Sequence, residues 1–171
     1  MPATVVVNFR TVVHASSNGM ATFFPDVCKT PAPPSPSPIP IPYPNIAQSS
    51  DTAQGSTTVK CDGNPVMIQG ANFSMSSGDE AGSAGGGMVS NTIKGKAEFV
   101  MFSFDVKFDG KSVPRQLDPM LGNKNASPNT PPMPELQPPM VVVSLPAVDP
   151  PGQEPSITDL VMELSGPEPS E

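Results

Sequence analysis

Tryptophan is absent from this sequence, and other residues that build large cores or catalytic sites are scarce. The 171 residues include one tyrosine, one histidine and two cysteines, and only 15% of them are charged. A single histidine excludes sites that need two or more imidazoles, and two cysteines are too few for a disulfide framework. No run approaches the roughly 20 apolar residues that span a bilayer, so we expect no stable membrane span.

Proline and glycine are abundant instead, with 25 and 14 copies. Such a chain is either disordered or built from short strands joined by tight turns. In residues 36–44 every second residue is proline. No helix interior tolerates this, but prolines at period two remove the N–H donors from only one edge of an extended chain. We therefore predict a strand that pairs along one edge only.

Two segments with the same short pattern predict two β-hairpins. Residues 59–66 are VKCDGNPV and residues 106–113 are VKFDGKSV. In each, a strand with alternating apolar residues leads into Asp-Gly, the strongest short hairpin signal. We interpret the two segments as copies of a duplicated unit in an all-β protein. A longer strand with two apolar faces is predicted over residues 97–108.

Charge divides the chain into two parts. Residues 1–126 hold all nine basic residues and nine acidic ones, whereas residues 127–171 hold seven acids and no base. A formally neutral body lacks the basic face of a nucleic-acid binder, so no nucleic-acid partner is expected. We expect a β-rich domain over residues 1–126 and a mostly irregular, acidic, proline-rich extension over residues 127–171.

Two pieces of the extension have a pattern of their own. Residues 140–145 are suited to a short strand that adds to an exposed sheet edge. Residues 156–165 predict a short helix. Ten residues do not hold a helix alone in water, so its apolar face either docks on the body or is a bait helix for an effector or adaptor. That face consists of Ile157, Leu160, Val161 and Leu164.

Three interpretations of the histidine and the cysteines stay open. His14 and Cys28 have the residue types of a base and a thiol nucleophile. Together with Cys61 they supply three of the four ligands that structural zinc takes. Cys61 is equally suited to be a small core residue. Asp79 and Glu80 are adjacent acids that point apart, and we expect them to accept hydrogen bonds from turn N–H groups.

Three stretches in order resemble a known family. They begin FPDVCKTPAPPSPSPIPIPYPN at residue 24, VKCDGNPVMIQGANFS at residue 59 and KGKAEFVMFSFDVKFDGKSV at residue 94. They resemble the PAAR-like proteins, relatives of the proline-alanine-alanine-arginine repeat proteins that tip the spike of type VI secretion and related contractile injection systems. The resemblance covers about residues 10–125.

The resemblance implies a small conical β-prism with pseudo-threefold symmetry. Its base would sit on the blunt end of a trimeric valine-glycine repeat spike protein, with one copy per trimer. The implied function is a non-enzymatic structural tip that sharpens the spike and carries or recruits an effector. Better-known members hold one structural zinc with three histidines and a cysteine. Since only one histidine is present here, a zinc site either uses a different set, for which His14, Cys28 and Cys61 are the candidates, or is absent.

Two other functions are compatible with the sequence. One is a small secreted toxin or enzyme that uses His14 and Cys28, and the other is a free-standing β-rich binding module. No signal peptide is recognised in the first residues. We therefore expect synthesis in a bacterial cytoplasm and export at the tip of the injection apparatus, into the medium or a target cell.

Overall fold

The structure, a computed structural model, describes residues 3–139 and confirms the predicted all-β class. Among these residues the one helical element is η1 (Ser49–Asp51), a single 3-10 turn. The strands are β1 (Val6–Val7), β2 (Arg10–Thr11), β3 (Met20–Thr30), β4 (Ile39–Gln48), β5 (Thr52–Ala53), β6 (Lys60–Cys61), β7 (Asn64–Pro65), β8 (Asn72–Phe73), β9 (Ser76–Ser77), β10 (Gly86–Gly87), β11 (Lys96–Phe99), β12 (Lys107–Phe108), β13 (Lys111–Ser112), β14 (Pro119–Lys124) and β15 (Met133–Leu136).

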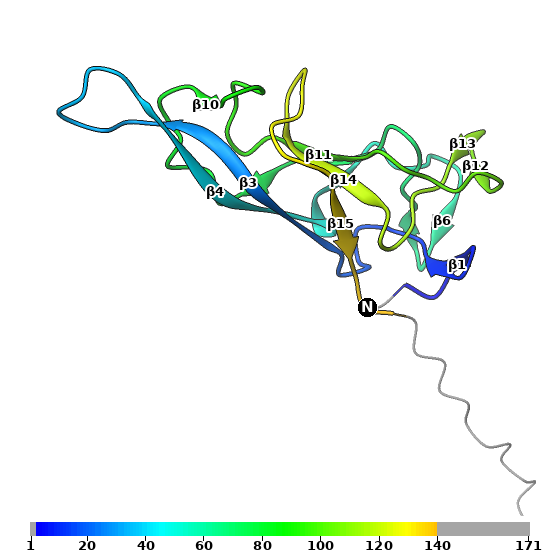
Figure 1. Cartoon of the computed structure of the whole chain (residues 1–171). Coiled ribbons are helices and arrows are strands. Elements are labelled where there is room, and N and C mark those ends of the chain that lie inside the picture. The colour runs from blue at the N-terminus through cyan, green and yellow to red at the C-terminus, as the bar shows by residue number, and fades with distance from the viewer. Residues whose placement is uncertain (1–2, 140–171) are drawn as a thin grey trace, which may run out of the picture. The chain divides into compact units, whose positions relative to one another are not determined.

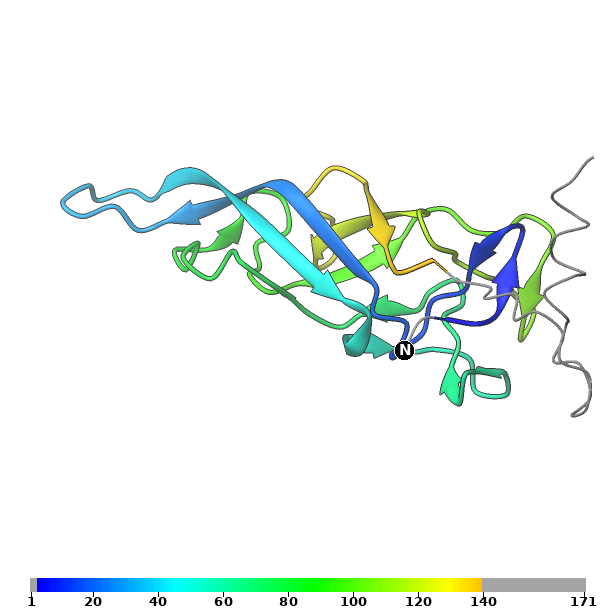
Figure 2. The same cartoon turned by 90° about the horizontal axis from the view of Figure 1, so that it is seen from below.

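A nine-stranded antiparallel sheet forms the main part of the described unit. Its strand order is β5-β8-β11-β14-β15-β3-β4-β9, and β10 also pairs with β3. Its longest feature is the β3–β4 hairpin, whose loop extends away from the other strands (Figure 1). Three separate two-stranded hairpins, β1–β2, β6–β7 and β12–β13, lie at the opposite end (Figures 1 and 2).

The proline-rich strand pairs along one edge, as the sequence predicts. Lys29 faces Pro40 and Val27 faces Pro42 across the β3–β4 ladder. Among the residues that the structure describes, the other edge of β4 pairs with β9 only at Ile46 and Ala47, beyond the last proline. Proline at alternate positions leaves the ladder to β3 intact and removes donors from the outer edge.

Two apolar clusters hold the described residues together. The larger lies under the sheet and includes Phe23, Phe73, Met67 and Met120, all fully buried. Phe23 packs directly on Gly122, where a Cβ would lie 2.4 Å from the aromatic ring. The smaller cluster lies beneath the three hairpins and consists of Val7, Val12, Cys61, Val66, Ile68 and Val113.

The predicted strand over residues 97–108 is wrong in its extent. β11 ends at Phe99, and the chain then leaves the sheet, with Met101 and Phe104 exposed. Alternating apolar residues do not guarantee a strand when no partner edge is available. The strand expected at 140–145 and the helix expected at 156–165, including Ile157, Leu160, Val161 and Leu164, lie outside the described residues.

β15 belongs to the segment that was expected to extend from the body. It pairs with β14 and with β3, where Glu135 faces Ala21. Over residues 3–139 no helix has the length and apolarity needed to cross a bilayer.

Candidate functional site

The three short hairpins are three copies of one unit. The sequence predicted the second and third, residues 59–66 and 106–113, and the structure adds a first copy over residues 5–12. Valines occupy equivalent first and last positions: Val5, Val59 and Val106 accept hydrogen bonds from Val12, Val66 and Val113. The first copy escapes detection because its turn is Asn8-Phe9 rather than Asp-Gly.

Backbone geometry is the same in all three turns. Both turn residues have positive φ in each copy: 49° and 65° at Asn8-Phe9, 51° and 78° at Asp62-Gly63, and 50° and 72° at Asp109-Gly110. This is the pattern of the type I′ turn, whose twist matches that of paired strands.

The copies are interlocked in a closed cycle, which we call the three-hairpin ring (residues 5–12, 59–66 and 106–113). Backbone hydrogen bonds run from residues that follow the second and third copies to another copy or the residue just after it: Met67 donates to Val13, Gln69 to Ser112 and Gln116 to Thr11. Since each copy is bonded to the other two, the ring has the backbone pattern of a pseudo-threefold unit.

Side chains at the turns repeat the same cycle. Thr4, before the first copy, donates from its backbone N to Asp62 of the second at 2.9 Å. Thr57, before the second, donates to Asp109 of the third at 3.1 Å. Ser103, before the third, donates from Oγ to Asn8 of the first at 2.6 Å. Each turn is therefore capped by the copy that precedes it in the cycle.

His14 is part of this ring. It is fully buried and pairs with Val66 in an isolated β-bridge. Its Nε2 lies 3.0 Å from Oδ2 of Asp62. Hydrogen bonds from the Thr4 side chain and backbone, together with the His14 contact, lower the pKa of Asp62. His14 thus ties the second turn to the apolar cluster.

A second cluster of functional groups lies inside the sheet, at the base of the β3–β4 hairpin. Asp26 and Cys28 lie two residues apart on β3, and Asp79 comes from the loop before β10; all three are fully buried. Their ligand atoms all lie within 4.8 Å of one another. Sγ of Cys28 is 3.7 Å from Oδ1 of Asp26 and 4.0 Å from Oδ2 of Asp79.

Amide groups surround Asp26. Nδ2 of Asn45 donates to its Oδ2 at 2.7 Å, and Asn123 and Asn129 donate to its Oδ1. Asp79 accepts the backbone N–H of Lys94 at 3.0 Å, as expected for a turn acid. In residues 3–139 neither carboxylate makes an ion pair.

Burial without a cation changes the acidity of this cluster. Burial raises the pKa of the Cys28 thiol to about 12, and the neighbouring Asp26 and Asp79 add to this effect. Burial and the charge of Asp26 raise the pKa of Asp79 to about 6, against a lowering by the Lys94 N–H. A protonated, buried thiol is a poor nucleophile at neutral pH.

The donor atoms of these three residues are of the types that bind a structural metal ion. One thiol and two carboxylates are ligands that zinc accepts, and a divalent cation would neutralise charge that no basic side chain compensates here. It would join β3 to the loop that carries Asp79. Such a site is not the set expected from the sequence: it contains Cys28, but His14 and Cys61 are not members.

The sequence held a partial signal for this cluster. Asp26 and Cys28 are two apart in a predicted extended segment, so their side chains fall on one face. Asp79 is more than 50 residues away, and only the fold brings it beside them. Cys61 lies 5% exposed in the small apolar cluster beneath the hairpins, where burial and then Asp62 raise its pKa.

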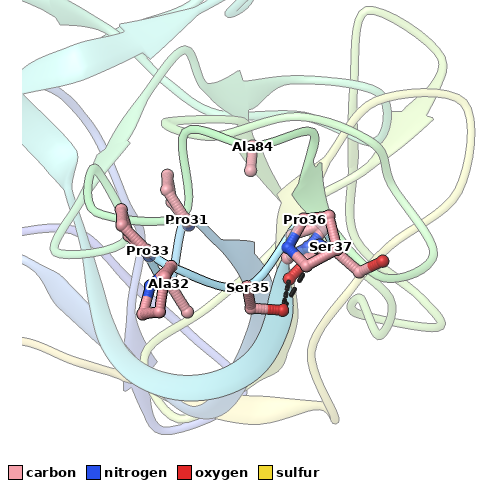
Figure 3. Close-up of a pocket in the computed structure, with 9 residues that line it drawn as sticks. Pro31, Ala32, Pro33, Ser35, Pro36, Ser37 and Ala84 are labelled. Atoms are coloured by element: carbon pink, nitrogen blue, oxygen red, sulfur yellow. Dashed lines mark hydrogen bonds between the residues drawn. The ribbon is translucent and has the colours of Figure 1, made fainter.

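The loop of the β3–β4 hairpin encloses a hollow with no catalytic chemistry. It is lined by residues 31–38 and by Ala84 from the neighbouring loop (Figure 3). Ser35 and Ser37 are its polar side chains, and Oγ of Ser35 donates to the backbone oxygen of Ser37 at 3.0 Å. This lining offers no acid, base or metal ligand.

Comparison with known proteins gives two matches. Residues 19–129 match the family model described as a toxin PAAR-like domain. The chain is 40% identical over 142 residues to a protein named DNase toxin Tse7 from Pseudomonas aeruginosa; the match covers 80% of this chain and 37% of that protein. This chain thus spans little more than a third of the relative's length. No solved structure gives a significant match.

The second match corrects one expectation. From the family resemblance we expected a protein without enzymatic activity. That prediction is wrong, because four-fifths of the chain matches a protein that is itself named as an enzyme acting on DNA. The expectation came from the family resemblance, which implied a structural tip whose toxic activity comes from a partner.

Proposed function

We propose a function from the premise that this chain belongs to the toxin PAAR-like domain family: it forms the tip of a type VI secretion spike and takes part in exporting a DNA-degrading toxin. The three-hairpin ring is the observation that carries this proposal. A closed cycle of three equivalent hairpins offers threefold-related backbone at one end of a single chain. Such an end suits a threefold-symmetric partner.

The partner of the tip is the trimeric valine-glycine repeat spike protein. One copy of this chain would cap one trimer, because its three hairpins would each contact one of the three subunits of the spike. Turns capped by side-chain hydrogen bonds support this role, since a loaded tip needs a backbone that does not fray.

The toxin half of the proposal rests on the relative named as a DNase. We assign the chain to the delivery of that kind of activity, with DNA in the recipient cell as the substrate. Export then takes place with the spike rather than through a general secretion signal.

The buried cluster of Asp26, Cys28 and Asp79 supports a structural role for metal in the same unit. These three residues would hold one zinc ion, since a thiolate ligand favours zinc over calcium or magnesium. When bound, the ion supplies charge neutralisation and a cross-link, while the amides of Asn45, Asn123 and Asn129 orient the Asp26 carboxylate.

Cryo-electron microscopy of this chain mixed with the trimeric spike protein tests the proposal. The expected result is density for one copy on the blunt end of each trimer, without imposed symmetry. A spike end that stays bare at saturating concentration would refute the tip role.

A separate assay addresses the toxin half. DNA-degrading activity on duplex DNA is measured for the purified chain and, in parallel, for the full-length relative that contains the matched region. Loss of toxin export after disruption of the ring, by Asp62→Ala combined with Asp109→Ala, is expected if this unit carries the toxin. Unchanged export of DNA-degrading activity would count against the proposal.

A further inference from the structure

We infer that Glu135 and Gln137, beside Gly19, bind one calcium ion. Glu135 is on β15 and Gln137 follows this strand directly, so the site shares no residue with the zinc cluster described above. The inference does not depend on the proposed function, because it needs no partner protein. It adds a ligand of a different chemical class, held by oxygen atoms alone.

Three oxygens of this site have no hydrogen-bond partner within residues 3–139. They are the two carboxylate oxygens of Glu135 and Oε1 of Gln137. Glu135 is fully buried and Gln137 is 7% exposed. Buried polar groups without partners cost stability, so a ligand that satisfies all three oxygens at once is favoured.

The nitrogen of the Gln137 amide fixes the direction of its oxygen. Nε2 donates to Oγ1 of Thr11 at 2.6 Å and to the backbone oxygen of Val12 at 2.9 Å. A rotated amide would place Oε1 against the Val12 oxygen, which has no proton to donate. Oε1 therefore points to the other side, where it lies 3.3 Å from the Cβ position of Gly19, and Oε1 of Glu135 lies 1.8 Å from the same point.

A proton alone does not satisfy this arrangement. A protonated Glu135 has a single O–H donor, whereas three acceptor oxygens meet here. A metal ion binds several oxygens at once, and carboxylate and glutamine oxygens are ligands of calcium. Zinc is not favoured, because the site offers no sulfur or nitrogen ligand. Calcium takes roughly six to eight oxygens, so backbone carbonyls or water would complete its shell.

The charges near the site favour a cation as well. Asp118 adds a second negative charge, which contributes to the raised pKa of Glu135. Arg10 and Arg115 both pair with Asp118, at 3.0 and 3.1 Å. Over residues 3–139 no basic side chain pairs with Glu135 itself. A bound ion would supply the positive charge that these residues do not provide.

Gly19 offers a route from solvent to the buried oxygens. It lines a surface hollow whose polar lining residues are Asn18, Gln48, Ser49 and Ser50. Oxygens of such side chains suit the passage of a hydrated cation. Any side chain at residue 19 would collide with Oε1 of Glu135, so glycine keeps this place open to the ligand.

The test adds calcium chloride to the purified full chain in calcium-free buffer, at about pH 9 and at about pH 5. Thermal melting measures stabilisation, and isothermal titration calorimetry measures affinity and stoichiometry. Glu135→Gln removes the charge and keeps the shape of the side chain. Glu80→Gln, at an exposed acid, is the matched control.

We expect one calcium per wild-type chain at about pH 9 and a rise of several degrees in its melting temperature when the ion is in excess. At about pH 5 a proton competes for Glu135, whose pKa is about 8, so binding should be at least about a hundredfold weaker. Glu135→Gln should show no rise at either pH, and Glu80→Gln should behave like wild type. Magnesium should give a smaller rise, because it demands a smaller octahedral shell.

Three outcomes would overturn the inference. The first is a wild-type melting temperature that calcium does not change at about pH 9. The second is a wild-type rise retained in Glu135→Gln, which would place the ion elsewhere, such as at the zinc cluster. The third is an equal rise at the two pH values, which would mean that Glu135 does not exchange its proton for the ion. This last comparison uses wild type only, so it decides the matter even where Glu135→Gln fails to fold.

Discussion

Glu135 and Gln137 direct unpartnered oxygens at the same point beside Gly19. A Cβ at residue 19 would lie 1.8 Å from Oε1 of Glu135 and 3.3 Å from Oε1 of Gln137. Glu135 is fully buried, and within residues 3–139 neither of its carboxylate oxygens nor Oε1 of Gln137 has a hydrogen-bond partner. Burial, and then the charge of Asp118, raise the pKa of Glu135 to about 8.

The simplest explanation for these unpartnered oxygens is that Glu135 is protonated. A neutral carboxyl carries no buried negative charge and has an O–H donor of its own. The nearby Asp118 is already bound by Arg10 and Arg115, at 3.0 and 3.1 Å, so these arginines do not neutralise Glu135.

The first prediction concerns pH and Glu135. Its pKa is raised in the folded state above its ordinary value of 4.5, so the folded state holds the proton more tightly than the unfolded chain does. The stabilisation is complete below about pH 4.5 and is lost as pH rises to about 8, by up to about 1.4 kcal/mol per pH unit.

Urea unfolding between about pH 5 and pH 9 measures this slope. Glu135→Gln keeps the shape and removes the titration, so its free energy of unfolding should depend less on pH than that of wild type. Glu80→Gln, at an exposed acid, is the control. Equal slopes for wild type and Glu135→Gln would show that Glu135 does not hold the proton.

The second prediction concerns the space beside Gly19. Gly19→Ala places a methyl group against Oε1 of Glu135, and overpacking of this kind costs about 1–3 kcal/mol of unfolding free energy. Glu135→Ala removes the obstacle, so the double variant should lose less than the sum of the two single changes. Strict additivity in this double-mutant cycle would contradict the geometry.

The third prediction concerns the buried cluster of Asp26, Cys28 and Asp79. If it holds zinc, elemental analysis of the purified protein finds about one equivalent, in line with a single structural site. A strong chelator then lowers the melting temperature. Cys28→Ser should lose the metal, while Cys61→Ser, a thiol change in the other apolar cluster, should keep it. The site would be refuted if the wild-type protein is purified without metal and neither zinc nor chelator changes its melting temperature.

The fourth prediction concerns the contact between Asp62 and His14. Asp62→Ala leaves Nε2 of the buried His14 without its 3.0 Å partner, and an unsatisfied buried polar group costs about 1–3 kcal/mol. Asn tolerates the left-handed conformation at this position, where φ is 51°. Asp62→Asn should therefore retain most of the stability in chemical denaturation. Equal losses in the two variants would mean that the lost charge, not the lost acceptor, sets the effect.

Local physical chemistry in the sequence was enough for the fold class. The alternating prolines of β4 exclude a helix and leave one pairing edge, a property of each residue's own N–H group. Asp62-Gly63 and Asp109-Gly110 demand positive φ and therefore tight hairpins, whatever lies around them. The resemblance to PAAR-like proteins also came from short segments whose order is visible along the chain.

Packing between distant segments decided the rest. Asn8-Phe9 turns as its two counterparts do because the interlocked ring holds it there, although its residues predict no such turn. Asp79 joins Asp26 and Cys28, and Glu135 meets Gln137 beside Gly19, because the sheet brings together side chains far apart in sequence. Burial creates their unusual acidity, and burial depends on neighbours that a local pattern does not specify.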